Sequence, residues 1–388
     1  TLYGRDTSLV YYDVTNYYFE IDKQDEMRRK GVSKEHRPDP IIQMGLFMDT
    51  DGIPLTYGLY PGNMLDKQTL IPSIRSIRTD YELGRIVIVA DKGMMAGDNI
   101  RQILLDNNGY VLSYSIRGAD AAFKEYVLQD DGYRWTQEEE YKLKSRIYPR
   151  EITVSTLQGK KQKVRIQEKQ VVFYSEKYAQ KAKADREAAI HKANHLVSSP
   201  AAYRKATTHG AAKYVKGKTV STKSGEMVPD AEQLLVFDAD TLAEEEKYDG
   251  YYAIVTSELD TTDEKIIEIY RGLWKIEESF KITKSDLETR PVYLSRQDHI
   301  EAHFLICFIA LVIARLLEKQ LEHRHAISKI LESLRRCSCS LLEQNLYLFD
   351  FYDQVLRDLG QQLDIDFSKK YRTVKEMKSI IGKSKKTV

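Results

Sequence analysis

The segment Arg85-Ile-Val-Ile-Val-Ala90 constrains the fold more than any other part of the chain. Its unbroken apolar run is typical of a strand that is buried on both faces, and such strands occur in sheets that helices cover on both sides. Asp91 follows directly at the carboxyl end of this run. We therefore expect an α/β core with a carboxylate at the edge of a central strand.

The segments around this strand predict the order strand, strand, strand, helix, strand, helix, strand. Aromatic and β-branched residues favour strands, Asp-Gly marks a hairpin turn, and apolar residues at helical spacing mark the helices. The strands are expected at 9–19, 41–48, 54–60, 85–90 and 110–116, where 9–19 is one strand or a pair of short strands around a turn. The hairpin turn is expected at 49–52, and the helices at 67–77 and 98–106.

The composition of the chain changes twice, which predicts an interrupted core. We expect a first core part at 1–116, an inserted β-containing domain at 117–248, a second core part at 249–320, and a helical C-terminal region with a basic tail at 321–388. The fold class is thus a mixed β-sheet flanked by helices. Because the sequence opens at Thr1 and enters a strand almost at once, we also expect an upstream domain.

Bulk properties indicate an ordinary soluble protein of a reducing cytoplasm. Lys and Arg number 59 against 58 Asp and Glu, so net charge alone indicates no polyanionic partner. Cys307, Cys337 and Cys339 are too few for a disulfide framework or a four-ligand zinc site. The apolar run 304–314 is shorter than the roughly 20 residues of a membrane span and predicts a buried helix.

Two aspartates stand where a metal ion fits. Asp13 lies inside the aromatic segment 9–19, where an ionised carboxylate is costly to desolvate unless a cation compensates it. Asp91 has an ordinary alternative as a turn residue or helix N-cap. Because ligands collect at the carboxyl ends of strands in open α/β sheets, neighbouring strands would give Asp13 and Asp91 a hard-oxygen site for Mg²⁺ or Mn²⁺.

Helical spacing indicates a third acid, Glu277. In a continuous helix, the residues at this spacing would form one stripe along the surface. The stripe mixes aromatic, acidic and basic residues, so it resembles neither a face that packs on the core nor a face that is exposed to solvent. The stripe consists of Tyr270, Leu273, Glu277, Lys281 and Lys284. A structural salt-bridge stripe is the alternative. Glu278 is rotated by roughly 100° from Glu277 and would point elsewhere.

These residues resemble the Y-x2-R-x3-E-x6-K signature of bacterial DDE transposases of the insertion-sequence-four group. Tyr270, Glu277 and Lys284 match it in spacing, whereas Leu273 stands where the signature has Arg, with Arg271 as a differently oriented substitute. Asp13-Val-Thr15 is similar to the first-acid segment of the family, and Val89-Ala-Asp91-Lys-Gly93 to its second.

The resemblance implies a ribonuclease H-like core and a metal-dependent DNA strand-transfer enzyme. Asp13, Asp91 and Glu277 would bind two Mg²⁺ or Mn²⁺ ions, and Tyr270 and Lys284 would contact the DNA backbone. Lys281 is added as a DNA contact because it lies on the same helix face. Arg271 is added because it is the substitute for the signature arginine. The implied partners are double-stranded transposon ends, target DNA and a second copy of the chain, in a bacterial cytoplasm.

Basic stretches and rival functions complete the expectations. Arg204, Lys205, Lys213, Lys216, Lys218 and Lys223 alternate with tyrosines, as on a surface that follows phosphates, although a solvated loop fits equally well. The lysine-rich tail 368–388 allows the same two interpretations.

Rival functions are a structure-selective nuclease that uses the same acids, and a domesticated DNA-binding protein without catalysis.

Overall fold

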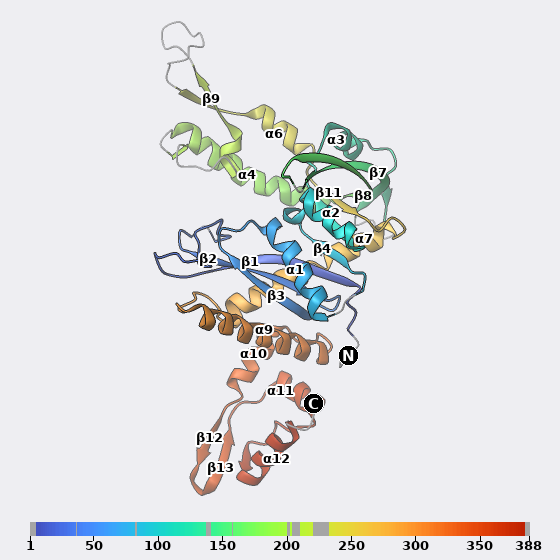
Figure 1. Cartoon of the computed structure of the whole chain (residues 1–388). Coiled ribbons are helices and arrows are strands. Elements are labelled where there is room, and N and C mark those ends of the chain that lie inside the picture. The colour runs from blue at the N-terminus through green and yellow to red at the C-terminus, as the bar shows by residue number, and fades with distance from the viewer. Residues whose placement is uncertain are drawn as a thin grey trace. The chain divides into compact units, whose positions relative to one another are not determined.

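The structure is a computed structural model, and it describes residues 5–35, 37–81, 84–136, 141–156, 158–199, 202–203, 210–219 and 233–384. The chain divides into two compact units (Figure 1). The first unit consists of Thr1–Gly109 with Arg271–Val388, and the second of Tyr110–Tyr270. Both units combine helices with strands, so the predicted mixed α/β fold is confirmed.

The central strands of the first unit lie in the order β3-β2-β1-β4. They are β1 (Leu9–Tyr18), β2 (Ile41–Met48), β3 (Pro54–Pro61) and β4 (Val87–Ala90). β2 pairs antiparallel with β1 and β3, whereas β4 pairs parallel with β1. This mixed sheet agrees with the expected ribonuclease H-like core.

The predicted hairpin turn between β2 and β3 forms around Asp49. Its carboxylate accepts the backbone N–H of Asp51 at 3.1 Å and that of Ile53 at 2.8 Å. Gly52 adopts a φ of 81°, a conformation that glycine reaches without a steric penalty. Every residue of β2 is buried, so the hairpin anchors the centre of the core.

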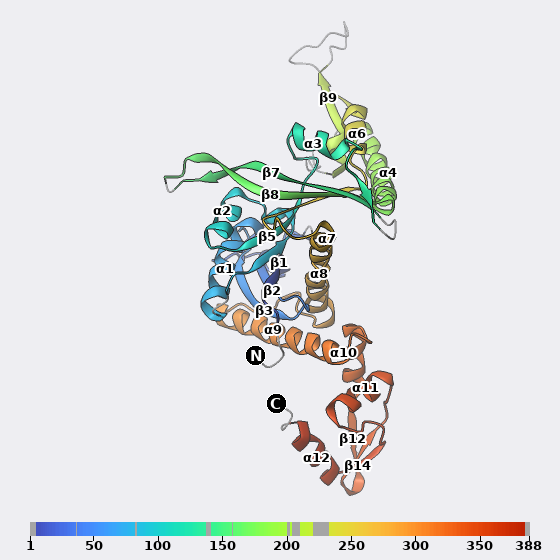
Figure 2. The same cartoon turned by 90° about the vertical axis from the view of Figure 1, so that its right-hand side faces the viewer.

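Helices cover both faces of this sheet, as the apolar β4 requires. Figure 2 shows α1 (Asp66–Tyr81) and α2 (Gly97–Leu105) on one side and α8 (Trp274–Lys281) on the other. The Tyr12 hydroxyl donates to Thr69 Oγ1 of α1 at 2.7 Å, so Tyr12 points towards α1. Because side chains alternate along a strand, Asp13 points towards the face that α8 covers.

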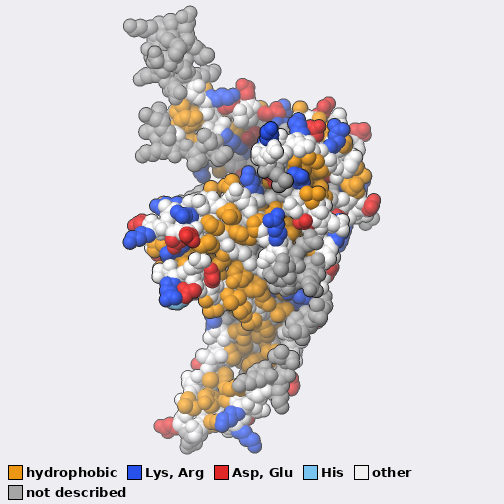
Figure 3. Space-filling view, viewed as in Figure 1, with side chains coloured by type: hydrophobic (Ala, Val, Ile, Leu, Met, Phe, Trp, Pro, Cys, Tyr) orange, Lys and Arg blue, Asp and Glu red, His pale blue; other side chains and the backbone are white. Residues whose placement is uncertain are grey.

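Helix α9 (Gln297–Gln320) packs on β3 and is apolar on more than its buried side. Phe304 and Leu311 are fully buried, but Ile306 is 66% exposed and Ile313 53%. Figure 3 shows hydrophobic side chains gathered over this helix. By length and composition alone α9 is apolar enough to cross a membrane, with 33% of its most apolar window buried. The predicted buried helix is therefore correct for one face only.

The C-terminal region is helical as predicted, but it also contains a small sheet that we did not expect. Its helices are α10 (Ile327–Arg336), α11 (Gln354–Leu363) and α12 (Val374–Ser384). The strands β12 (Cys339–Leu342), β13 (Leu346–Phe349) and β14 (Tyr371–Thr373) pair in that order. The sequence does not predict these strands, because such short apolar runs lack a diagnostic period.

The second unit contains strands in the order β5-β11-β8-β7-β6. These are β5 (Gly109–Tyr114), β6 (Arg134–Trp135), β7 (Lys142–Ser155), β8 (Lys161–Tyr174) and β11 (Tyr251–Thr256). A separate pair consists of β9 (Val215–Thr219) and β10 (Gln233–Phe237). The helices are α3 (Ala121–Leu128), α4 (Glu176–Ser198), α6 (Ala239–Glu246) and α7 (Asp263–Arg271). The predicted insertion 117–248 thus falls inside a β-containing unit that extends further on both sides.

Candidate active site

The pairing of β1 with β4 brings the first two candidate acids together. Leu9 pairs with Val87 and Tyr12 with Ala90 in parallel register, so Asp13 and Asp91 come next on the two neighbouring strands. Residues in register on parallel strands point to the same face of the sheet. The prediction that these strands are neighbours is confirmed. Asp91 takes the N-cap position of the short turn η1 (Lys92–Met94), but its side chain makes no capping hydrogen bond there.

The electrostatic surroundings of Asp13 are unusual for a carboxylate. Burial raises the pKa of Asp13 to about 6, against the opposing effects of the Lys34 ammonium and of a hydrogen bond from the Val14 N–H. The negative charges of Asp91 and Asp66 raise the same pKa further. Asp13 thus carries the desolvation penalty that we expected, and Lys34 offsets it only in part.

Sequence reasoning missed Asp66 and Lys34. Asp66 begins α1, and burial raises the pKa of its carboxyl while Lys34 opposes that shift. Lys34 lies in the polar connection before β2 and donates to the Val14 carbonyl next to Asp13. An acid in the first turn of a helix is too common to stand out in a sequence, and a loop lysine carries no positional signal at all.

Helix α8 lies along the face of β1 that carries Asp13. Tyr11, Asp13 and Tyr17 alternate onto that face, and Gly272, just before α8, lies against the Tyr11 hydroxyl. After α8, the Thr283 hydroxyl shares a hydrogen bond of 2.8 Å with that of Tyr17. From residue 11 to 17 a strand advances roughly 20 Å, and from 272 to 283 a helix advances roughly 17 Å. The segment with Glu277 therefore runs beside Asp13.

Gly272→Ala is expected to destabilise the protein. A Cβ at this position would collide with the Tyr11 hydroxyl, and the shift needed to relieve the overlap costs about 1–3 kcal/mol. Chemical denaturation monitored by circular dichroism measures the loss. The control is Gly93→Ala, because a Cβ at Gly93 meets nothing within 4 Å. Equal stability of the two variants would contradict the close packing of α8 on β1.

The two neighbouring glutamates of α8 have different surroundings. Glu278 accepts from Arg315 Nη1 at 2.9 Å, and Arg315 also binds Ser279 Oγ and Glu318. Glu277 is exposed, and it lies on the other side of the buried Ile276 from Glu278. Since Glu278 belongs to a structural ion-pair network around the buried Arg315, Glu277 is the better candidate for the third acid.

The predicted single stripe does not exist, because the helix is broken. Helix α7 ends at Arg271, Gly272 and Leu273 form a turn, and α8 passes into the π-helical turn η3 (Ile282–Asp286). Leu273 is buried, whereas Arg271, Glu277 and Lys281 are exposed and Lys284 is half-buried. Tyr270 is assigned to the second unit, whereas the other four residues of the stripe are assigned to the first. Our assumption of a continuous helix was wrong, and a glycine that contacts a tyrosine explains the interruption.

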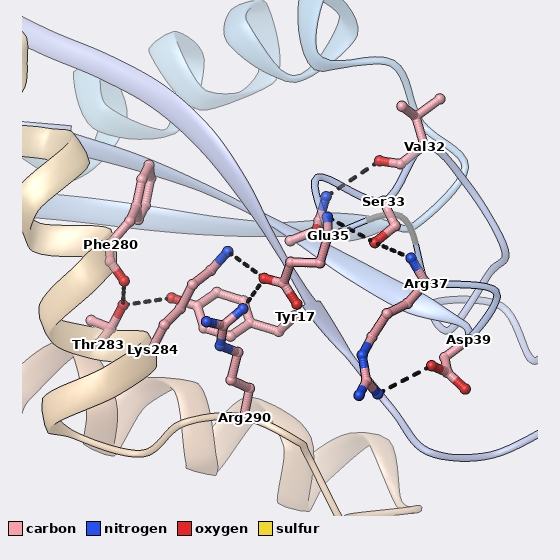
Figure 4. Close-up of polar contacts among 11 residues, drawn as sticks. Tyr17, Val32, Ser33, Glu35, Arg37, Asp39, Phe280, Thr283, Lys284 and Arg290 are labelled. Atoms are coloured by element: carbon pink, nitrogen blue, oxygen red, sulfur yellow. Dashed lines mark hydrogen bonds and ion pairs between the residues drawn. The ribbon is translucent and has the colours of Figure 1, made fainter. Parts of the chain in front are cut away.

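Lys284 has a partner that we did not foresee. Its ammonium lies 3.2 Å from a carboxylate oxygen of Glu35, and Arg290 binds the same oxygen (Figure 4). Burial and the nearby Lys34 lower the pKa of Lys284 to about 8, while Asp13 opposes the shift. Lys284 does form a salt bridge, which was our structural alternative, but its partner lies in a distant loop and not in the stripe.

The residues present fit a divalent cation only in part. Asp13, Asp91 and Asp66 supply hard carboxylate oxygens, and the burial that raises the pKa of Asp13 is offset only in part by Lys34. Within the described ranges, no three His, Cys, Asp or Glu side chains are grouped closely enough to hold one ion. Two of the predicted ligands are thus neighbours, and Glu277 does not join them in this arrangement.

The basic stretches give little support to a DNA-binding surface. Lys213 pairs with Glu245 at 2.5 Å and Lys216 with Asp238 at 2.6 Å. Arg204, Lys205 and Lys223 lie outside the described residues, as do His36 and the last four residues of the tail. Near the start of the tail, Lys369 pairs with Glu376. The interpretation as solvated, locally neutralised surface therefore gains weight for the described lysines.

A family model described as the transposase DDE domain matches residues 19–313 of the chain. The chain belongs to this family. Asp91 and Glu277 lie within the match, whereas Asp13 precedes it, so the case for Asp13 depends on its register with Asp91. No curated protein matches the chain.

Two solved transposases resemble the chain distantly in structure. A piggyBac transposase synaptic complex with hairpin DNA has a TM-score of 0.41 at 7% identity, over 84% of this chain and 51% of that one. A Mos1 transposase paired-end complex with the left transposon end has a TM-score of 0.19 at 17% identity, over 31% and 38%. The chain thus spans about half the length of the first, and neither likeness assigns a role to any residue.

Proposed function

We propose that this transposase cleaves DNA at the ends of a transposon and joins those ends to target DNA, using divalent metal ions. The observation that carries the proposal is the placement of Asp13 next to Asp91, on one face of the sheet, in a chain of the transposase DDE domain family. The raised pKa of Asp13 means that a cation is electrostatically favoured there. We further propose membership of the insertion-sequence-four group, with Leu273 in place of the signature arginine.

Asp13, Asp91 and Glu277 would hold two Mg²⁺ or Mn²⁺ ions. When bound, such ions activate the attacking water or 3′-hydroxyl and stabilise the leaving oxygen. Because Glu277 is exposed on a helix that runs along the Asp13 face, its carboxylate would turn towards the two aspartates when the ions bind. Ion binding would supply the free energy for that approach, as in sites where metal binding is coupled to folding.

The remaining predicted residues would hold the DNA backbone. Lys281 is exposed one helical turn beyond Glu277, and Arg271 is exposed at the end of α7. Lys284 is half-buried near Asp13, where an ammonium meets a phosphate beside the scissile bond. Tyr270 is retained because it occupies the tyrosine position of the signature. A second copy of the chain on paired ends and a bacterial cytoplasm complete the proposal.

An assay on flanked transposon-end duplexes with Mg²⁺ tests the function. We expect cleavage at the end and, with target DNA present, a joined product in which a new phosphodiester links the end to the target. Cleavage without any joined product would favour the structure-selective nuclease. Binding to ends without cleavage in either Mg²⁺ or Mn²⁺ would favour the domesticated DNA-binding protein.

A further inference from the structure

The Glu35 carboxylate lies between two cations that come from a different part of the chain. Lys284 Nζ is 3.2 Å from Glu35 Oε1, and Arg290 Nη1 binds the same oxygen (Figure 4). The three side chains are 11%, 24% and 28% exposed for Lys284, Glu35 and Arg290. An acidic oxygen that accepts from an ammonium and a guanidinium together has the coordination that proteins give to a phosphate oxygen.

The backbone of this loop is held independently of the Glu35 side chain. The Ser33 hydroxyl accepts the N–H groups of Glu35 at 3.2 Å and of Arg37 at 3.3 Å. The Asn16 amide donates to the Val32 carbonyl at 3.3 Å. These contacts fix the loop against β1, so the carboxylate can leave the two cations by rotating about its side-chain bonds. An arrangement of this kind allows exchange without unfolding of the loop.

Lys284 is held independently of Glu35 as well. Thr283, next to Lys284, is buried, and its hydroxyl donates to the Phe280 carbonyl at 3.0 Å. The Lys284 ammonium also lies 5.5 Å from the centre of the Tyr17 ring, an attractive cation–π distance. Lys284 would therefore stay in place when Glu35 leaves. A site whose ammonium is fixed and whose anion is movable is suited to an incoming anion.

We propose that Lys284 and Arg290 form a subsite for one backbone phosphate of DNA, and that Glu35 occupies this subsite in the free protein. The assignment of the ligand to DNA rests on the function proposed above. Exchange of one anion for another leaves both cations paired, so the desolvated Lys284 never loses its counter-charge. Glu35 would also keep weaker anions out of the site.

Glu35→Gln is expected to tighten binding to transposon-end DNA roughly fivefold, which is the strength of one partly exposed ion pair. Arg290→Ala is expected to weaken binding and to reduce the slope of log K against log salt by about one unit, the share of one phosphate. The double variant should lose the gain of Glu35→Gln. The control is Glu20→Gln, because Glu20 lies before the same connection but pairs with Arg37.

The measurement is fluorescence anisotropy of a labelled end duplex, in EDTA and at several salt concentrations, with the melting temperature of each variant. Unchanged or weaker binding by Glu35→Gln together with a lower melting temperature would overturn the proposal in favour of a structural ion pair. If inorganic phosphate raised the melting temperature of Glu35→Gln while its DNA affinity stayed at the wild-type value, the subsite would belong to a free anion, which also overturns it.

This experiment is separate from the test of catalysis, since EDTA excludes cleavage from every arm. Failure of the wild-type protein to cleave or join DNA in Mg²⁺ would remove the proposed enzyme function, yet tighter DNA binding by Glu35→Gln would still support the phosphate subsite. Conversely, active cleavage with no effect of Glu35 or Arg290 on DNA binding would overturn the subsite alone.

Discussion

Asp13→Asn is expected to abolish metal-dependent cleavage and, at the same time, to raise the melting temperature of the metal-free protein. Loss of a shared metal ligand removes several kcal/mol of transition-state stabilisation, which corresponds to a decrease in rate on the order of 1000-fold or more. The amide has nearly the shape of the carboxylate but no charge, so it removes the repulsion with Asp91 and Asp66 and the desolvation that raises the pKa of Asp13.

The stabilisation should depend on pH in a defined direction. Asp13 titrates at about 6 in the folded protein and near 3.9 when unfolded, so its folded state prefers the protonated form. The wild type therefore loses stability relative to the variant as pH rises from about 4 to about 6, and the difference is constant above that range. The shift of about two pKa units corresponds to at most roughly 3 kcal/mol.

Differential scanning fluorimetry in EDTA between pH 4 and 8 measures this difference in stability. The control is Asp22→Asn, because Asp22 is exposed in the connection that follows β1. Addition of Mg²⁺ should stabilise the wild type and leave Asp13→Asn unaffected, because binding to the folded state alone raises apparent stability. A variant that melts below the wild type at pH 8 in EDTA would show that Asp13 has a structural role instead.

The sequence was sufficient to predict the part of the site that local rules determine. The apolar run before Asp91 defines a buried strand, and the aromatic run around Asp13 defines another, so both elements follow from side-chain preference alone. The order of strands and helices along the chain led to the correct expectation that these strands are neighbours. The parallel register itself then brings the two carboxylates onto one face.

The contacts that escaped prediction join residues that are distant in sequence. Glu35 and Lys284 are 249 positions apart, and no periodicity or capping rule relates a loop to a helix at that separation. The break at Gly272 was missed for the same reason, because it is the Tyr11 hydroxyl across the sheet that excludes a larger residue. Helical spacing still placed Glu277 and Glu278 on different flanks, since both lie in the unbroken α8.

Glu278→Gln is expected to affect stability more than catalysis. Arg315 is almost fully enclosed, and its Nη1 is 2.9 Å from carboxylate oxygens of both Glu278 and Glu318. Weakening one of these two charged contacts should lower the free energy of unfolding by about 1–2 kcal/mol, while Glu318 still compensates the guanidinium. Cleavage, measured below the melting temperature, should stay within a few-fold of the wild-type rate.

Glu277→Gln is expected to have the opposite effects. Its exposed side chain contributes little to folding, so the unfolding free energy should change by less than about 0.5 kcal/mol. The loss of a metal-binding charge should lower the cleavage rate on the order of 1000-fold. DNA affinity in EDTA should be preserved, because it arises from basic side chains that contact phosphates.

Chemical denaturation, fluorescence anisotropy and single-turnover cleavage, measured in parallel for both variants, decide between the two glutamates. Equal loss of cleavage in Glu278→Gln at full stability would mean that α8 presents its other flank to the metal ions, and Arg315 would then be a positioning residue of the active site.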